Sequence, residues 1–402
     1  MEIDLFNPDS FADGQPHDQY RWLRENDPVH RHPEPAGPGF WAITRYDDVR
    51  AVSRDTETFS SEPTVMITDP PLDTPEMSGE ARMMLMMDPP DHRRYRMLVV
   101  RGFTPPSARR IAPRIEELAI AIIDEVIERG ECDLVTDIAG ELPSYVIAEL
   151  MGIPLDDGRK LYDLTEKMHA APGTIPEYEQ AAAAMEMLQY ASGVAEEKRR
   201  DPGDDLASAL VQSEIDGDRL TDLEFNLFFL LLINAGGDTT RNLVAGGMHA
   251  LFDHPDERRR IQADIDTLMP TTVEELLRFV SPVVHMRRTA TTATVIGNEQ
   301  IAEGDKVVVY YGSANRDAAV FPNPDRLDSG RAPNDHLAFG GGGPHFCLGA
   351  HVARIEIAAM LRQILTRLPD IEPAGPTDWQ ASNFISGPRH LPVRFSPGRR
   401  ST

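Results

Sequence analysis

The sequence has little cysteine and little positive charge. Its two cysteines, Cys132 and Cys347, cannot form a disulfide framework, which favours a reducing compartment. With 40 Lys and Arg against 65 Asp and Glu, the net charge of −25 argues against partners such as nucleic acid or anionic membrane surfaces. The N-terminus has neither a basic nor an apolar region, so we expect no secretion signal and a cytoplasmic protein.

Long hydrophobic runs are also missing. The longest apolar run, residues 227–233, is far shorter than the roughly 20 residues that a membrane-spanning helix needs. Proline and glycine are plentiful, at 33 and 29 residues, which predicts well-defined turns between elements. A chain of 402 residues is long enough for a large core and, by length alone, for two or three domains.

One glycine-rich stretch, residues 339–349, is unusual. It reads Phe-Gly-Gly-Gly-Gly-Pro-His-Phe-Cys-Leu-Gly and precedes an apolar helical pattern over residues 350–358. Four glycines allow positive φ and tight curvature, so that several N–H groups can point at the thiolate of Cys347. The alternatives are an inert cysteine beside a plain turn, or a phosphate-binding loop. The second lacks the Lys-Ser/Thr pair that closes such a loop.

A long buried helix is predicted from about residue 221 to Asp253. Thr221 and Glu224 form a capping box at its start, and its surface is apolar nearly all round. Its middle, residues 235–240, reads Ala-Gly-Gly-Asp-Thr-Thr, and glycines and paired threonines are poor residues inside a helix. This stretch is either a packing notch for another helix or a functional turn.

Two further pairs of charged residues are spaced for one face of a helix. His92 and Arg96, after two prolines at a helix start, suit a carboxylate ligand or form a solvated basic face. Glu275 and Arg278 would be an ordinary helix ion pair by themselves.

Together, the ordered Phe, Gly, His, Cys and Gly of the 339–349 stretch, the Asp238–Thr239 pair and Glu275-x-x-Arg278 resemble the signatures of the cytochrome P450 superfamily. The resemblance covers nearly the whole chain. It implies one mainly α domain over residues 1–402, a triangular prism of helices with a minor β region, in place of the several domains that length suggests. Phe339 and Cys347 are eight positions apart, one more than is usual, and this lengthened loop is similar to that of actinobacterial sterol and methyl-branched lipid hydroxylases.

The resemblance implies a cofactor, haem b, with the Cys347 thiolate as the axial ligand of its iron. It places His92, Arg96 and Arg288 on the haem propionates, with Arg287 left open as an alternative to Arg288. The other residues that it assigns to the haem site are Ala235, Phe339, His345 and Gly349.

The resemblance also assigns the remaining roles. Asp238 and Thr239 would relay protons where an opened turn of the long helix accepts dioxygen and water. Glu275 and Arg278 would hold the haem-side fold, with Arg326 as the third member. The residues expected to contact substrate are Met86, Asn234, Val284, Met286 and Phe384. We interpret His285 as a strand histidine with satisfied hydrogen bonds and Cys132 as structural.

The implied reaction inserts one oxygen atom from O2 into a C–H bond, with electrons from NAD(P)H delivered by a ferredoxin reductase and a ferredoxin. A group of arginines between residues 93 and 114 is either a docking patch for the acidic ferredoxin or solvated surface. The lengthened loop and the methionines at 83–87 favour a large apolar substrate, and we expect terminal hydroxylation of a sterol side chain or a methyl-branched isoprenoid lipid. The alternatives are a smaller terpenoid substrate, a peroxygenase, which should replace the Asp–Thr pair, and a haem-based sensor, which does not need it.

Overall fold

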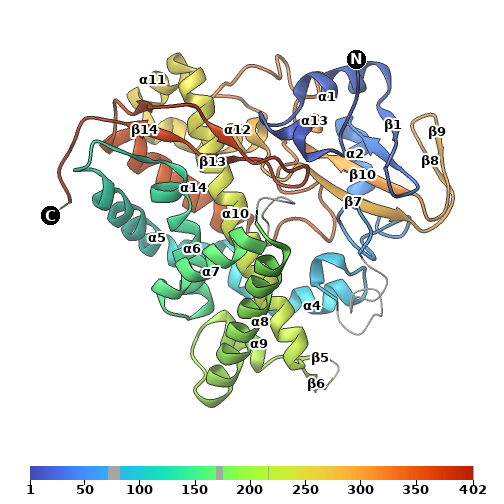
Figure 1. Cartoon of the computed structure of the whole chain (residues 1–402), viewed down its shortest axis with the longest axis horizontal. Helices are drawn as coiled ribbons and strands as arrows, with labels where there is room; N and C mark the ends of the chain where they lie inside the picture. The colour runs from blue at the N-terminus through green and yellow to red at the C-terminus, as the bar shows by residue number, and fades with distance from the viewer. Residues whose placement is uncertain (71–81, 169–174, 216, 402) are drawn as a thin grey trace.

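The computed structural model describes residues 1–70, 82–168, 175–215 and 217–401. Helices form one side of the molecule, and a small mixed sheet with short helices forms the other (Figure 1). The expectation of a mainly helical chain with a minor β region is confirmed. None of the helices in the described ranges is both long and apolar enough to cross a bilayer.

The longest helix, α10 (Asp222–Asp253), runs through the middle of the molecule (Figure 1). The capping box is present: the Thr221 hydroxyl accepts from the Glu224 N–H at 3.2 Å, and the Glu224 carboxylate accepts from the Thr221 N–H at 2.7 Å. With 32 residues, α10 is on the order of 50 Å long. Most of its side chains are buried, as expected for a helix that is apolar nearly all round.

Other helices pack on α10 from several directions. Among them are α6, α8, α12 and α14. Two glycines on α10 allow α12 to approach closely, because a Cβ atom on Gly246 would lie 2.8 Å from a Val280 methyl and one on Gly247 would lie 3.1 Å from a Leu276 methyl. The α-helices besides α10 are α1 (His17–Asn26), α2 (Tyr46–Arg54), α4 (Asp91–Val99), α5 (Pro105–Val126), α6 (Glu141–Met151), α7 (Leu155–Met168), α8 (Glu177–Arg200), α9 (Leu206–Val211), α11 (Pro255–Ala263), α12 (Ile265–Val280), α13 (Tyr311–Ala314) and α14 (Ala350–Arg367).

The largest sheet has the strand order β1-β2-β10-β7-β3. Its strands are β1 (Val29–His32), β2 (Phe40–Ile43), β3 (Phe59–Ser60), β7 (His285–Ala290) and β10 (Lys306–Tyr310). The pair β2 and β10 is parallel, and the other neighbours are antiparallel. Shorter strands form three-stranded and two-stranded ribbons: β4 (Glu131–Asp133), β5 (Glu214–Ile215), β6 (Asp218–Arg219), β8 (Thr294–Ile296), β9 (Glu299–Ile301), β11 (Glu372–Pro373), β12 (Asp378–Trp379), β13 (Pro388–His390) and β14 (Pro392–Arg394).

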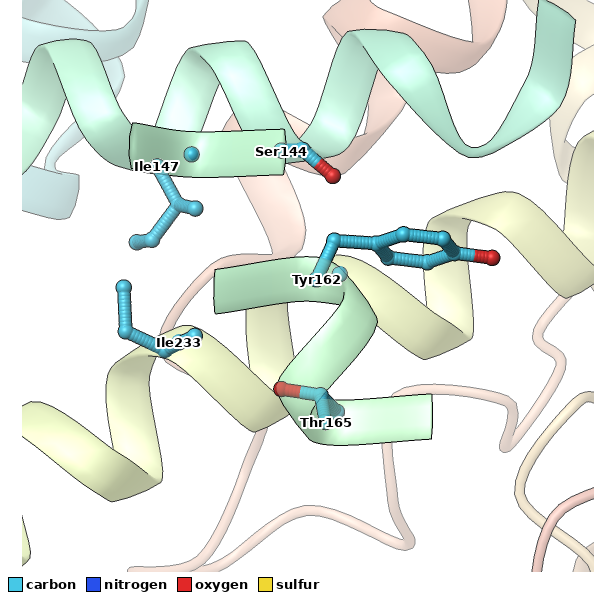
Figure 2. A pocket seen from close by; sticks show the side chains of 7 residues that line it. Ser144, Ile147, Tyr162, Thr165 and Ile233 are labelled. Atoms are coloured by element: carbon cyan, nitrogen blue, oxygen red, sulfur yellow. The ribbon is translucent and has the colours of Figure 1, made fainter. Parts of the chain in front are cut away.

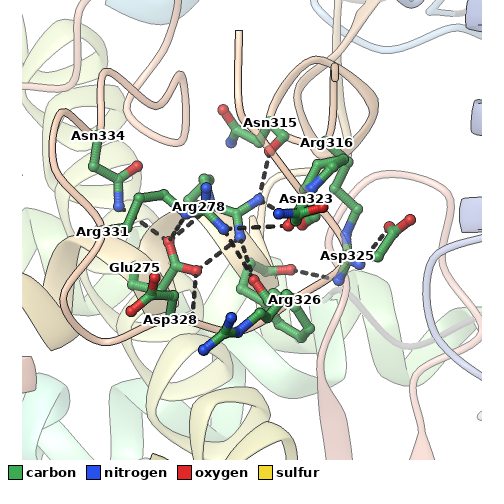
Figure 3. A network of polar contacts seen from close by, with 12 residues as sticks. Glu275, Arg278, Asn315, Arg316, Asn323, Asp325, Arg326, Asp328, Arg331 and Asn334 are labelled. Atoms are coloured by element: carbon green, nitrogen blue, oxygen red, sulfur yellow. Dashed lines mark hydrogen bonds and ion pairs between the residues drawn. The ribbon is translucent and has the colours of Figure 1, made fainter. Parts of the chain in front are cut away.

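A buried ion pair on α12 holds the long connection between β10 and α14. Arg278 Nη2 and Nε each donate to one Glu275 carboxylate oxygen at 2.8 Å, and both side chains are 1% exposed or less. Arg278 Nη1 also donates to the main-chain carbonyl of Asn315 at 2.8 Å (Figure 3). The same atom donates to the main-chain carbonyl of Pro324 at 2.9 Å. The pair therefore ties α12 to two points of a segment without regular secondary structure.

The third side chain of this network is Arg331, so the assignment of Arg326 was wrong. Arg331 Nε donates to the Glu275 carboxylate at 3.0 Å (Figure 3). Arg326 contributes its main-chain carbonyl, which accepts from Arg278 and Arg331, while its own side chain is exposed. The turn that follows Pro324 presents the backbone of Arg326 to α12, which leaves the Glu275 carboxylate open to Arg331. Glu275 also accepts from the Asp328 N–H and the Asn334 amide.

Replacing Arg278 by Ala should lower the free energy of unfolding by about 3–5 kcal/mol, because the Glu275 carboxylate would stay buried without its main partner. Arg326→Ala is the matched control. Its side chain is exposed, so the change should stay within about 0.5 kcal/mol. Urea unfolding followed by circular dichroism measures both variants. Equal effects of the two substitutions would contradict the assignment of these side chains.

Candidate active site

A cavity of about 470 Å³ lies beside the middle of α10. The 339–349 loop and the start of α14 border it, as do a 3-10 turn (Met84–Met86) and the beginning of β7. Most of its wall is apolar, with Met83, Met84, Leu85 and Met86 together along one part. An enclosed, mostly apolar space with a few converging polar groups is the usual form of a small-molecule site.

Cys347 opens into this cavity two residues before the N-cap of α14. Its N–H donates to the Phe339 carbonyl at 3.0 Å, which closes the loop. The cysteine is surrounded by protein but accessible from the cavity. Burial raises the pKa of the Cys347 thiol, and the N–H groups of Gly349 and Ala350 lower it. These N–H groups at a helix start would stabilise a thiolate.

The expected positive φ values occur in the loop. Gly340, Gly342 and Gly343 have φ values of +97°, +93° and +79°. At Gly343 a Cβ atom would also lie 3.0 Å from the Ser53 carbonyl oxygen on α2. The glycine run therefore allows both the curvature of the loop and its close packing on α2.

Four nitrogen-bearing side chains face the cavity near Cys347: His92, Arg96, Arg288 and His345. Burial lowers the pKa of His92 to about 4 and that of His345 to about 2, so both rings are neutral near pH 7. Their ring centroids are 4.1 Å apart. In the described residues, His92 Nδ1, His345 Nδ1 and Arg288 Nε are buried without a hydrogen-bond partner.

Of the two adjacent arginines, Arg288 faces the cavity and Arg287 does not. The alternation of β7 turns Arg287 to the opposite face, where it donates to the Asp69 carboxylate at 2.5 Å and to the Ile67 carbonyl at 3.2 Å. Arg288 is 3% exposed, and its Nη1 donates to the Arg287 carbonyl at 2.7 Å. No carboxylate of the described residues forms an ion pair with Arg288, and a buried guanidinium without a counter-ion suits a ligand that carries carboxylates.

Asp238 and Thr239 both lie on the cavity wall. Asp238 is 5% exposed, and its Oδ1 lies 3.8 Å from Arg241 Nη2. The Thr239 hydroxyl donates to the Ala235 carbonyl at 3.1 Å. At the position of the predicted opened turn the helix is not interrupted, because α10 is continuous from Asp222 to Asp253. The local feature in the structure is the side-chain hydrogen bond from Thr239 to Ala235, since a hydroxyl that bonds four residues back competes with the main-chain hydrogen bonds of the helix.

Four of the five predicted substrate contacts line the cavity, namely Met86, Asn234, Met286 and Phe384. Val284 does not: it is fully buried in a separate core cluster with Leu5 and Phe11. β7 begins only at His285, so its alternation does not extend back to Val284. Val283 forms an isolated bridge to Ile385 and takes the position on the cavity wall instead.

Of two residues outside the family motifs, Cys132 is as expected, whereas the prediction for His285 is only partly confirmed. His285 is buried, and its Nδ1 bonds to the Asn383 carbonyl at 2.7 Å, while its Nε2 has no partner in the described residues, so its hydrogen bonding is only half satisfied. Cys132 lies in β4, and burial raises the pKa of its thiol to about 12, which leaves it unreactive.

Sequence reasoning missed Glu356. This α14 residue is 4% exposed and lines the cavity. Its carboxyl group forms a hydrogen bond with the Thr240 side chain. Burial raises its pKa to about 8, so the carboxyl is neutral near pH 7. A signal was present, because Glu356 occupies an apolar position in the helical pattern of residues 350–361.

The fold and this cavity, with a cysteine at a helix start opposite a long buried helix, are those of a haem-thiolate enzyme. The chain belongs to the cytochrome P450 family, whose sequence model matches residues 11–369. The expected superfamily and fold are therefore confirmed, and with them the enzyme class, a monooxygenase. The family implies a haem-thiolate cofactor.

Known relatives and a solved structure resemble most of the chain. A methyl-branched lipid omega-hydroxylase of Mycobacterium tuberculosis is 40% identical over 90% of this chain and 85% of the relative. A steroid C26-monooxygenase of Rhodococcus jostii is 36% identical over 98% of this chain and 84% of the relative. The structure of Mycobacterium marinum cytochrome P450 CYP268A2 in complex with pseudoionone matches with a TM-score of 0.92 and 39% identity, over 98% of this chain and 99% of that one.

Replacing Glu356 by Gln should change how stability depends on pH. The Glu356 carboxyl has a pKa of about 8 in the folded chain and an ordinary value of 4.5 when unfolded, so the folded state binds more protons between these values. Its contribution to the free energy of unfolding is therefore full below the lower value and falls as pH rises, by up to about 1.4 kcal/mol per pH unit. Urea unfolding across this pH range should show that the free energy of unfolding of the variant increases relative to that of the wild type as pH rises. Parallel pH profiles would contradict the assignment.

Proposed function

We propose that this cytochrome P450 hydroxylates the chain end of a methyl-branched isoprenoid lipid or the side chain of a sterol. The observation that carries the proposal is the large cavity beside Thr239, whose wall is mostly apolar and rich in methionine. Unbranched, polarisable methionine side chains adapt to a bulky apolar ligand. The names of the relatives, a methyl-branched lipid omega-hydroxylase and a steroid C26-monooxygenase, support the same substrate class.

The chain's own residues fit haem b. Cys347 would hold the iron, and Arg288 and Arg96, with His92 beside them, would hold the two carboxylates. The fit rests on the buried polar atoms without hydrogen-bond partners in the described residues, Arg288 Nε and His92 Nδ1, and on the absence there of an ion pair with Arg288. When bound, haem supplies the reductive activation of dioxygen that inserts one oxygen atom into a C–H bond.

Asp238 and Thr239 would move the protons that this reaction needs. The Thr239 hydroxyl is held at the Ala235 carbonyl, at the edge of the cavity, where it can pass a proton to a group bound there. Asp238 lies beside it on α10, close to the buried Arg241 guanidinium, and would resupply the proton. The apolar wall would exclude bulk water from the same space.

Electrons would come from NAD(P)H through a ferredoxin reductase and a ferredoxin. Exposed arginines on α4, α5 and the turn between them give this acidic chain a basic area suited to an acidic partner: Arg93, Arg94, Arg101, Arg109 and Arg110. We expect reduction by the ferredoxin to weaken as salt is added, because such steering is screened.

Thr239→Ala should consume NADPH but form little product, with the fraction of electrons that reach product falling about tenfold or more. The variant lacks the hydroxyl that passes the proton, so reduced oxygen should leave as hydrogen peroxide. Thr239→Ser keeps a hydroxyl on the same carbon and is the matched control. Product, NADPH and peroxide are measured together. Fully coupled turnover by the alanine variant would refute the role of Thr239.

Optical titration of the ferric protein tests the substrate class. We expect a tight shift of the main haem absorption band with a cholestenone-like sterol or a branched fatty alcohol, because both fill the large apolar cavity. A monoterpenoid should bind weakly. A shift with the monoterpenoid alone would contradict the proposed substrate, and a purified protein that never shows a haem band would overturn the assignment of Cys347.

A further inference from the structure

One polar side chain on the cavity wall has no role in the chemistry proposed above. Asn234 lies on α10, one helical turn before Asp238. The other polar side chains on the described part of the wall are the cations and histidines near Cys347, the Asp238–Thr239 pair, and the hydrogen-bonded pairs Glu356 with Thr240 and Tyr311 with Ser53. Asn234 is therefore an amide in an otherwise apolar stretch of wall, beside Leu231 and Leu232.

Thr165 on α7 sets the orientation of the Asn234 side chain from outside the cavity. The Thr165 hydroxyl lies 3.0 Å from Asn234 Oδ1, and Thr165 is 2% exposed. Figure 2 shows this hydroxyl turned toward the part of α10 that carries Ile233. With Oδ1 bound by Thr165, the Nδ2 group keeps two N–H donors, and no described residue accepts from it.

An amide in this position makes the cavity selective. When a substrate fills the space and removes water, an N–H that gains no partner is left desolvated. A hydrocarbon therefore leaves the Asn234 amide unpaired, whereas a ligand with a suitably placed carbonyl oxygen satisfies it. The bonded oxygen would also fix which carbon atoms lie next to Thr239.

We propose that the Asn234 amide donates a hydrogen bond to a carbonyl oxygen of the substrate, with Thr165 as the residue that positions it. The substrate class is then a branched isoprenoid or steroid that carries a keto oxygen, rather than a pure hydrocarbon. This inference rests on the proposed function and narrows its substrate.

A hydroxyl group is the competing ligand chemistry. The Thr165 hydroxyl also lies 3.0 Å from the Leu161 carbonyl, and its single proton can serve only one acceptor fully. Were the proton given to Leu161, a reversed Asn234 amide would donate to Thr165 and present its oxygen to the cavity, where it would favour an alcohol. The orientation of the Asn234 amide in the structure favours a ketone, and a series of related ligands distinguishes a ketone from an alcohol.

The test compares three ligands of one skeleton by optical titration of the haem-loaded protein. They are the acyclic isoprenoid ketone geranylacetone, the alcohol formed by reducing its carbonyl, and the hydrocarbon with a methylene in its place. The wild type should bind the ketone about tenfold more tightly than the hydrocarbon, with the alcohol between them. In Asn234→Leu the ratio of ketone to hydrocarbon affinity should fall to about one.

Two matched variants separate polarity from packing. Leu231→Ala, on the same helix, changes the volume of the wall but not its polarity, so it should weaken all three ligands by the same factor. Thr165→Val removes the positioning hydroxyl and should reduce the ketone preference, whereas Thr165→Ser should keep it.

A preference that survives in Asn234→Leu, or an alcohol that binds more tightly than the ketone, would overturn the inference. Failure of all three ligands and of the cholestenone-like sterol contradicts the proposed function as well, while equal binding of ketone and hydrocarbon contradicts this inference alone.

Discussion

The position of Cys347 depends on the buried ion pair of Glu275 and Arg278. Arg278 binds the Asn315 carbonyl, and the Asn315 side chain in turn accepts from the Leu337 N–H at 2.7 Å. The Leu337 carbonyl accepts from Gly340, and the Phe339 carbonyl accepts from Cys347. A continuous series of hydrogen bonds thus connects α12 with the cysteine through a segment that has no helix or strand to hold it. A buried ion pair in bidentate contact holds the Arg278 side chain in one orientation, and this side chain makes the first hydrogen bond of the series.

The charge of the side chains around Cys347 is opposite in sign to the net charge of the whole chain. The chain carries a net charge of −25, yet the described part of the cavity near Cys347 presents two arginines and two neutral histidines, and no described carboxylate forms an ion pair with Arg288. Keeping a guanidinium such as that of Arg288 dehydrated without a counter-ion is unfavourable for the protein alone. The arrangement is understandable if an anionic group completes it, and a dicarboxylate cofactor is such a group. Cofactor binding should then stabilise the fold as well as enable the chemistry.

The polar residues that depart from helix preferences on α10 and α14 lie on the cavity wall. Thr239 and Asp238 interrupt an apolar helix at the cavity, Asn234 does so one turn earlier, and Glu356 does so on α14. Each adds a polar atom to a wall that would pack more favourably without it. Such local conflicts are expected where a protein holds a reactive or selective group in place.

Much of the fold and of the site could be predicted from the sequence alone. The capping box and apolar pattern of α10, the glycine loop and the motif around Cys347 depend on neighbouring residues, whose geometry is fixed by helix period and backbone freedom. The two predicted contacts that the structure contradicts both involve distant segments. Arg331 rather than Arg326 meets Glu275, and Val283 rather than Val284 faces the cavity.

The tertiary structure decided these points for a physical reason. The choice between two arginines in one loop, or between two valines before a strand, follows from what packs against each, and those partners lie tens to hundreds of residues away. The same holds for the Thr165 hydroxyl that orients Asn234 and for the burial that keeps Glu356 protonated. Sequence determined which groups this chain has and which of them share a helix face, whereas long-range packing determined which of them face the cavity and in which orientation.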